Sequence, residues 1–158
     1  MSKKTSIIAI TLLIATAVVL GFVLVNKGDG PVIGVIMSDK MVGSVKDFET
    51  VNLSEGSGVY IILKKEYNKF NEKFMTDIPS GKDLYANIYF VECPKGSKYT
   101  ARWVTEGKTV KEEIKELVTE QKGVASFVFD GNKVISGNYS LELYNEGKKI
   151  FEYKFPIH

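Results

Sequence analysis

The longest hydrophobic run in the chain lies near its start, from Ser6 to Val25. The run contains no charged residue, and as a helix with a rise of about 1.5 Å per residue it would be about 30 Å long, the thickness of the hydrocarbon core of a bilayer. A core helix of a globular domain would carry a polar face, which this run lacks. The pattern therefore predicts a transmembrane helix over residues 6–25.

The charges beside this run predict its orientation. Lys3 and Lys4 precede it and only Lys27 follows it closely, so we expect residues 1–5 in the cytoplasm and the rest of the chain outside a single-pass cell membrane protein. A cleaved signal peptide is the alternative, because Ala15-Thr16-Ala17 has the form of a cleavage site. Apolar sequence continues past that site to Val25, which favours an uncleaved anchor. Residues 26–31 then form a short linker.

Most of the chain beyond the linker alternates between apolar and polar positions with a period of two, which predicts β-strands. The alternation is clear from Asp83 onward, and turn residues separate its segments. Two earlier runs, Val32–Met37 and Val59–Leu63, are apolar enough to be buried strands. Phe48, Val51 and Leu53 indicate a further short strand. No element is assigned to Lys64–Lys73. Many short strands at this spacing predict an antiparallel β-sandwich over residues 32–158.

The segment Thr109–Lys122 allows two interpretations. Thr109 and Glu112 form a capping box, and Gly123 lies where a helix would end. The segment nevertheless falls between two predicted strands, and its Glu and Lys residues would protect a sheet edge from aggregation. We favour a charged edge strand over a helix.

Trp103, the run Gly137-Asn138-Tyr139-Ser140-Leu141 and the hairpin Tyr144–Lys149 resemble immunoglobulin-like sandwich domains on the outer face of prokaryotic membranes. The resemblance implies that Trp103 packs into the core and that Tyr139 takes the place of the tyrosine near the start of the sixth strand. The usual disulfide is missing, because Leu141 stands where the second cysteine would be.

The charge balance excludes one class of partner. The formal net charge is +2, from 21 basic and 19 acidic residues. Three of the basic residues flank the hydrophobic run, so the part of the chain beyond it has 18 basic against 19 acidic residues. Such a surface lacks the concentrated basic face that nucleic-acid binding needs, and we expect no nucleic-acid partner.

Residues suited to catalysis are scarce. The only histidine is His158 and the only cysteine is Cys93, which removes His-based general base catalysis, Cys-His nucleophiles and the usual zinc sites. We expect a protein that is not an enzyme, with no cofactor and no metal site. Cys93 cannot form an intrachain disulfide, and we expect it to be a buried small hydrophobe.

One candidate partner-binding face remains. Tyr85, Asn87 and Tyr89 lie on the side of the strand Leu84–Val91 that faces away from the predicted core, and exposed tyrosines offer rigid contact area to peptides or sugars. The alternative, that Val32–Met37 or Val59–Leu63 covers this strand and the tyrosines are half-buried, stays open and is the one we favour.

Two functions fit these features. The first is a membrane-anchored extracytoplasmic binding module that contacts another envelope protein, a wall polymer or another ligand. The second is a structural or regulatory accessory subunit of a membrane or envelope complex. Its anchor would pair with another helix through the small residues of Thr11-x-x-x-Ala15 and Ala17-x-x-x-Gly21.

Overall fold

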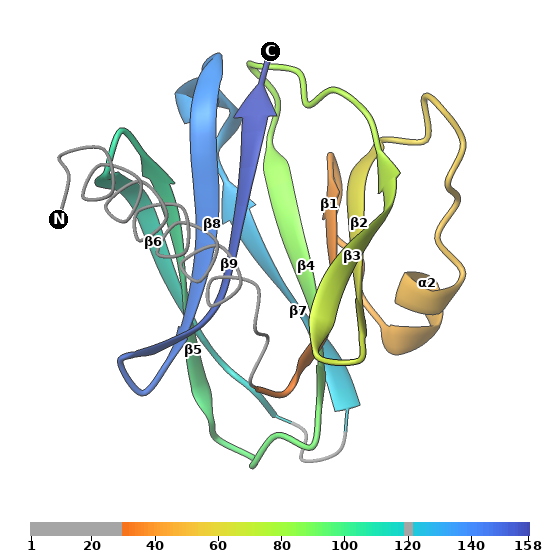
Figure 1. Ribbon diagram of the computed structural model, residues 1–158, viewed down its shortest axis with the longest axis vertical. Helices are drawn as coiled ribbons and strands as arrows, with labels where there is room; N and C mark the ends of the chain where they lie inside the picture. Colours follow the sequence, from red (N-terminus) through yellow and green to blue (C-terminus); the bar gives the residue numbers. More distant parts are fainter. Residues whose placement is uncertain (1–29, 119–121) are drawn as a thin grey trace, which may run out of the picture.

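The computed structural model describes residues 30–118 and 122–158, which fold into two antiparallel β-sheets packed face to face (Figure 1). The five-stranded sheet has the order β3-β2-β1-β4-β7 and the four-stranded sheet the order β6-β5-β8-β9. The mainly β, sandwich-type fold expected from the alternation is therefore confirmed. The strands are β1 (Val32–Ser38), β2 (Val59–Glu66), β3 (Lys69–Met75), β4 (Leu84–Val91), β5 (Lys98–Thr105), β6 (Lys108–Glu116), β7 (Lys122–Phe129), β8 (Gly137–Asn145) and β9 (Lys148–Ile157).

The core lies between the sheets and consists of the inward half of each alternating strand. Trp103 is fully buried, as expected, and its ring stacks on Phe129 with centroids 5.3 Å apart. Tyr139 is buried beside Phe129 and Phe155. Cys93 is also buried, as a free thiol. Burial raises the pKa of the Cys93 thiol, because the interior disfavours the thiolate.

β6 is an edge strand, so the interpretation of Thr109–Lys122 as an edge strand is confirmed for its first part. The side chains of β6 that point toward the other sheet are charged. Lys115 donates a hydrogen bond to the carbonyl oxygen of Ser126, and Glu113 accepts one at 2.9 Å from the backbone N–H of Val128. Both backbone groups belong to β7, the adjacent edge of the other sheet. Charged side chains thus bridge the two sheets where β6 and β7 meet.

A segment with a short helix covers the outside of the five-stranded sheet (Figure 1). The prediction of a short strand around Phe48, Val51 and Leu53 is wrong, because the helix α2 (Val45–Glu49) forms there instead. Ser44 caps this helix by accepting a hydrogen bond from the backbone N–H of Asp47 at 3.1 Å, which stabilises the first turn. Phe48 then packs on the sheet in a second hydrophobic cluster with Ile36, Val42, Val59, Ile62 and Tyr89.

β3 occupies sequence to which the alternation assigned no element. A bulge in its pairing with β2 lies between Ile62 and Leu63, which pair with Phe74 and Glu72. Phe70 packs against the main core and Phe74 against the second cluster, on the opposite face of the sheet. Residues four apart normally share one face of a strand, so the bulge hides the period of two.

The sandwich has two ends, which we call the entry end and the far end. Gly30 lies at the entry end, together with the turns at residues 67–68, 92–97 and 146–147. His158 and the turn at residues 106–107 lie at the far end, the upper end in Figure 1. The predicted anchor over residues 6–25 lies outside the described residues. Among the residues that are described, no helix is long and apolar enough to cross a membrane.

Candidate functional site

The face that carries Tyr85, Asn87 and Tyr89 is not an open surface. Asn87 is completely buried and Tyr89 is 8% exposed, whereas Tyr85 is half-buried. The Tyr89 ring meets Phe48 of α2 edge to face at 5.2 Å, and its hydroxyl donates a hydrogen bond to Glu49 at 3.3 Å. The favoured alternative, a covered face, is therefore confirmed for Asn87 and Tyr89, although the segment between β1 and β2 covers them instead of Val32–Met37 or Val59–Leu63, which are strands of the same sheet.

Asn87 instead fastens this covering segment to the sheet. Its Oδ1 accepts hydrogen bonds from the backbone N–H of Val42 at 2.8 Å and from the hydroxyl of Ser126 at 2.6 Å. Its Nδ2 donates to the hydroxyl of Ser38 at 2.9 Å and to the carbonyl of Ile36 at 3.2 Å. A buried side-chain amide whose oxygen and nitrogen are both hydrogen-bonded stabilises one arrangement of the backbone around it. The structure gives Asn87 a role in the fold.

The outer face of the four-stranded sheet, which points away from the core, is polar. Strand register aligns its side chains in rows that run across the sheet. Val104, Ser140 and Lys154 form a row near the far end. The next row carries four charges: Glu112 on β6, Arg102 on β5, Glu142 on β8 and Glu152 on β9.

A network of hydrogen bonds orders these charges. The Arg102 guanidinium lies 4.5 Å from the centre of the Tyr144 ring and bonds to Glu112 at 2.5 Å. Tyr144 donates its hydroxyl to Glu142 at 2.6 Å. Lys149 lies between Glu142, at 3.1 Å, and Glu152, at 2.7 Å. The side chains of Glu142 and Glu152 are only 15% and 12% exposed, so Lys149 separates two carboxylates that would otherwise repel each other.

The network shifts the pKa values of its members. Burial alone would raise the pKa of Glu142, but hydrogen bonds from Tyr144 and Lys149 and the charges of Lys149 and Arg102 lower it overall. The hydrogen bond to Glu142 raises the pKa of Tyr144, with burial adding to the effect. The hydrogen bond to Glu152 raises the pKa of Lys149, against the effect of burial. Each group therefore keeps its usual charge state at neutral pH.

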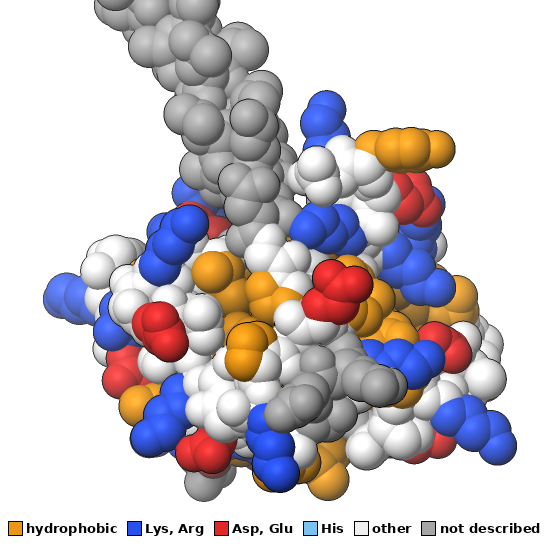
Figure 2. Space-filling view, turned by 90° about the horizontal axis from the view of Figure 1, so that it is seen from below, with side chains coloured by type: hydrophobic (Ala, Val, Ile, Leu, Met, Phe, Trp, Pro, Cys, Tyr) orange, Lys and Arg blue, Asp and Glu red, His pale blue; other side chains and the backbone are white. Residues whose placement is uncertain are grey.

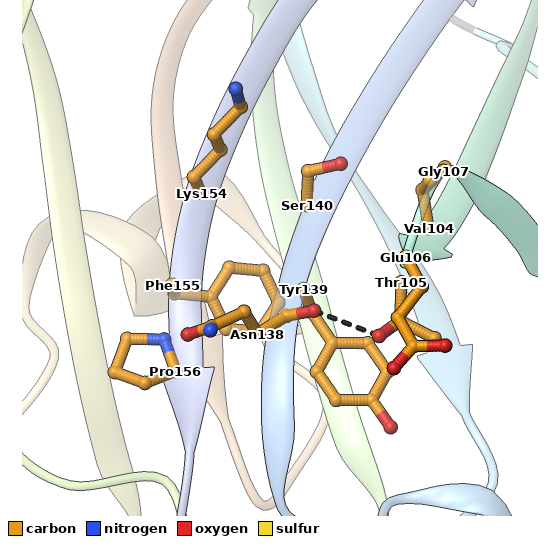
Figure 3. A pocket seen from close by; sticks show the side chains of 10 residues that line it. All are labelled: Val104, Thr105, Glu106, Gly107, Asn138, Tyr139, Ser140, Lys154, Phe155 and Pro156. Carbon is orange, nitrogen blue, oxygen red and sulfur yellow. Dashed lines mark hydrogen bonds between the residues drawn. The ribbon is translucent and has the colours of Figure 1, made fainter.

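A groove of about 430 Å³ opens at the far end of this face (Figure 3). The Ser140 hydroxyl and the Lys154 ammonium stand on one side of it, and Thr105, Glu106 and Gly107 of the β5–β6 turn on the other. Thr105 donates its hydroxyl to the carbonyl oxygen of Asn138 at 2.8 Å, which fixes the turn to β8. The rings of Tyr139 and Phe155 lie behind the groove and support it (Figure 3).

The alternation placed Ser140, Glu142 and Lys154 on the outside of their strands, but it gave no sign of a groove. The groove depends on the β5–β6 turn standing beside the first residues of β8 and the last residues of β9. The turn residue Thr105 lies 33 positions before Asn138, to which it is hydrogen-bonded. Sequence patterning describes one strand at a time, so it could not bring them together.

The described residues contain no group of three or more His, Cys, Asp and Glu side chains that could hold a metal ion. His158 lies 3.9 Å from Asp77 at the far end, and both side chains are largely exposed. The groove offers an ammonium, a hydroxyl, an amide and a carboxylate, which suit polar recognition. A comparison of the chain with models of known families gives no match, and a comparison with curated proteins gives none either.

Proposed function

We propose that the chain is a membrane-anchored extracytoplasmic binding module built on an immunoglobulin-like sandwich. The strand order of the four-stranded sheet supports the immunoglobulin-like type. In immunoglobulin variable domains, strands C′, C, F and G are neighbours, with the core tryptophan on C and the conserved tyrosine near the start of F. The order β6-β5-β8-β9 places Trp103 on the second strand and Tyr139 near the start of the third, which fits this pattern.

The outer face of the four-stranded sheet is the binding surface in this proposal. The observation that carries it is the contrast between the two outer faces. The segment between β1 and β2 covers the outside of the five-stranded sheet with a hydrophobic cluster. The four-stranded sheet instead presents ordered charges and the groove beside Ser140 and Lys154. Charges that are already held in place lose little entropy when a partner binds.

The groove favours a polar partner, either a segment of another envelope protein or a wall polymer. Lys154 can pair with a carboxylate or phosphate, because its side chain is 75% exposed and makes only a long contact of 3.8 Å with Glu152. Ser140, Asn138 and Glu106 can exchange hydrogen bonds with hydroxyl or amide groups. Binding without chemistry is the proposed activity, because no nucleophile with its own base is present among the groove residues.

Site-specific photo-crosslinking in intact cells tests the proposal. A crosslinking residue in place of Lys154 should capture a partner. The same residue in place of Lys46, which is exposed on α2 over the other sheet, serves as the control and should capture none. Filling the groove with Ser140→Trp should abolish the Lys154 crosslink while leaving the expression level unchanged. Equal crosslinking from positions 154 and 46 would contradict the assignment of the face.

The alternative proposal is an accessory subunit whose anchor pairs with another membrane helix. The spacing of Thr11, Ala15, Ala17 and Gly21 supports it. In that case crosslinkers in residues 11–21 should capture a partner and those at position 154 should not.

A further inference from the structure

Three hairpins of the described chain share the same two-residue turn. The turns are Tyr67-Asn68, Glu106-Gly107 and Glu146-Gly147, and all six residues have positive φ, from 49° to 79°. Positive φ at both positions marks the type I′ turn, which favours Asn, Asp and Gly. Glutamate stands first in two of the turns, but tyrosine stands first in the third.

The tyrosine at this position makes no contribution to the core. Tyr67 is fully exposed, at 102%, although tyrosine usually buries much of its ring. A bulky residue with a φ of 49° is also strained relative to asparagine or glycine. Tyrosine at position 67 is favoured neither by burial in the core nor by the residue preference of the turn. Contact with a partner outside the domain is the explanation that remains.

The Tyr67 turn lies where the chain enters the domain. The ammonium of Lys65, two residues before Tyr67, donates a hydrogen bond to the carbonyl oxygen of Gly30 at 3.2 Å. The pairing of β1 with β2 ends at Gly34 and Lys64, and the same register continued would set Gly30 opposite Asn68. Only residues 26–29 separate Gly30 from the predicted anchor, and four residues span at most about 14 Å. An inserted anchor therefore holds this turn close to the bilayer surface.

The entry end and the far end of the domain also differ in charge. At the entry end, residues 65–70, 90–99, 115–118, 122–123 and 144–149 contain eight lysines and four glutamates. At the far end, residues 37–40, 54–60, 74–85, 104–109 and 128–138 contain four lysines and six acidic residues. Figure 2 shows the entry end, where basic and acidic side chains surround a partly hydrophobic surface. A basic end attracts anionic lipid headgroups.

We propose that the entry end rests on the lipid surface, with Tyr67 in the headgroup region and the flanking lysines against anionic headgroups. Tyrosine is enriched at membrane–water interfaces because its ring is apolar and its hydroxyl is polar. The contact fixes the orientation of the sandwich and turns the groove at the far end away from the bilayer. This inference rests on the membrane anchor of the proposed function.

Fluorescence quenching with the full chain in lipid nanodiscs tests the contact. In a Cys93→Ala background, a single cysteine in place of Tyr67, Glu106 or Glu146 carries a fluorophore. The lipids carry a nitroxide quencher on the headgroup. The three positions are the same position of the same turn, so their labels are equivalent in local geometry. We expect quenching several-fold stronger at position 67 than at position 106, with position 146 in between.

The contribution of the Tyr67 side chain to the lipid contact is tested with the fluorophore at position 146. Tyr67→Asn suits the type I′ turn better and should not impair folding, but it should reduce quenching at position 146. Replacing anionic lipid by zwitterionic lipid, or raising the salt concentration, should reduce it as well. Equal quenching at positions 67 and 106 would overturn the lipid contact while the anchor stands. A chain that is extracted from membranes by alkaline carbonate would overturn the anchor and this inference together.

Discussion

Asn87→Ala should destabilise the domain more than any other substitution of a polar residue in the five-stranded sheet. The change removes three short hydrogen bonds of a buried side chain, to Val42, Ser126 and Ser38. Each bond contributes about 0.5–1.5 kcal/mol net, and a buried N–H left without a partner costs about 1–3 kcal/mol more. The expected loss is about 3–5 kcal/mol, a large part of the stability of an ordinary domain.

Urea unfolding of the full chain in mild detergent measures this loss. The chain contains a single tryptophan, Trp103, which is fully buried, so its fluorescence reports the unfolding of the sandwich. With an m value of about 2 kcal/mol per molar urea, the midpoint should fall by roughly 2 M. Hydrogen exchange should also show faster exchange of the Val42 amide than in the wild type, because Asn87 is its acceptor.

Asn71→Ala is the matched control. Asn71 lies on β3 of the same sheet, is exposed and donates one hydrogen bond to Glu66 at 3.1 Å. Exposed side chains of this kind usually change stability by no more than about 0.5 kcal/mol. If Asn87→Ala is as stable as Asn71→Ala, the covering segment is not fastened through Asn87.

Three further predictions concern other parts of the domain. Trp103→Ala should lower the unfolding free energy by about 3–5 kcal/mol in calorimetry, because it empties the centre of the core. The Cys93 thiol, whose pKa burial raises, should react with a maleimide only in denaturant, as mass spectrometry would show. Glu142 has a lowered pKa in the fold, so its carboxylate stabilises the domain at neutral pH and this stabilisation is lost as the pH falls through the folded pKa. Glu142→Gln should therefore unfold with a weaker acid dependence than the wild type below about pH 5 in urea titrations.

The sequence predicts the strands whose apolar and polar residues alternate regularly, and it misses the elements where the alternation is interrupted. The strands β4, β5, β7 and β8 alternate without interruption over their inward faces, and their positions follow from the pattern alone. β3 does not, because its bulge moves Phe70 and Phe74 to opposite faces. The helix α2 is stabilised by a cap at Ser44 and by packing on the sheet, where Phe48 meets Tyr89, 41 positions further along the chain. Local apolar spacing therefore predicted a strand there.

The candidate site was less predictable than the fold. Tyr85, Asn87 and Tyr89 face away from the core, as alternation predicts, but alternation cannot say what lies on the other side of a sheet. Asn87 shows the difficulty, since a buried polar side chain and an exposed one look alike in sequence. The groove at Ser140 and Lys154 depends on three pieces of chain that meet only in the folded state.

The side chains that bridge β6 and β7 affect whether the edges of the two sheets can pair with other molecules. Edge strands can pair with strands of other molecules, and proteins protect them with charge or cover. Here Lys115 and Glu113 occupy the carbonyl of Ser126 and the N–H of Val128, two groups that an incoming strand would need. β6 thus shields β7 from intermolecular pairing without adding a strand to its sheet. The Glu and Lys residues that favoured an edge strand in Thr109–Lys122 include the side chains that give this protection.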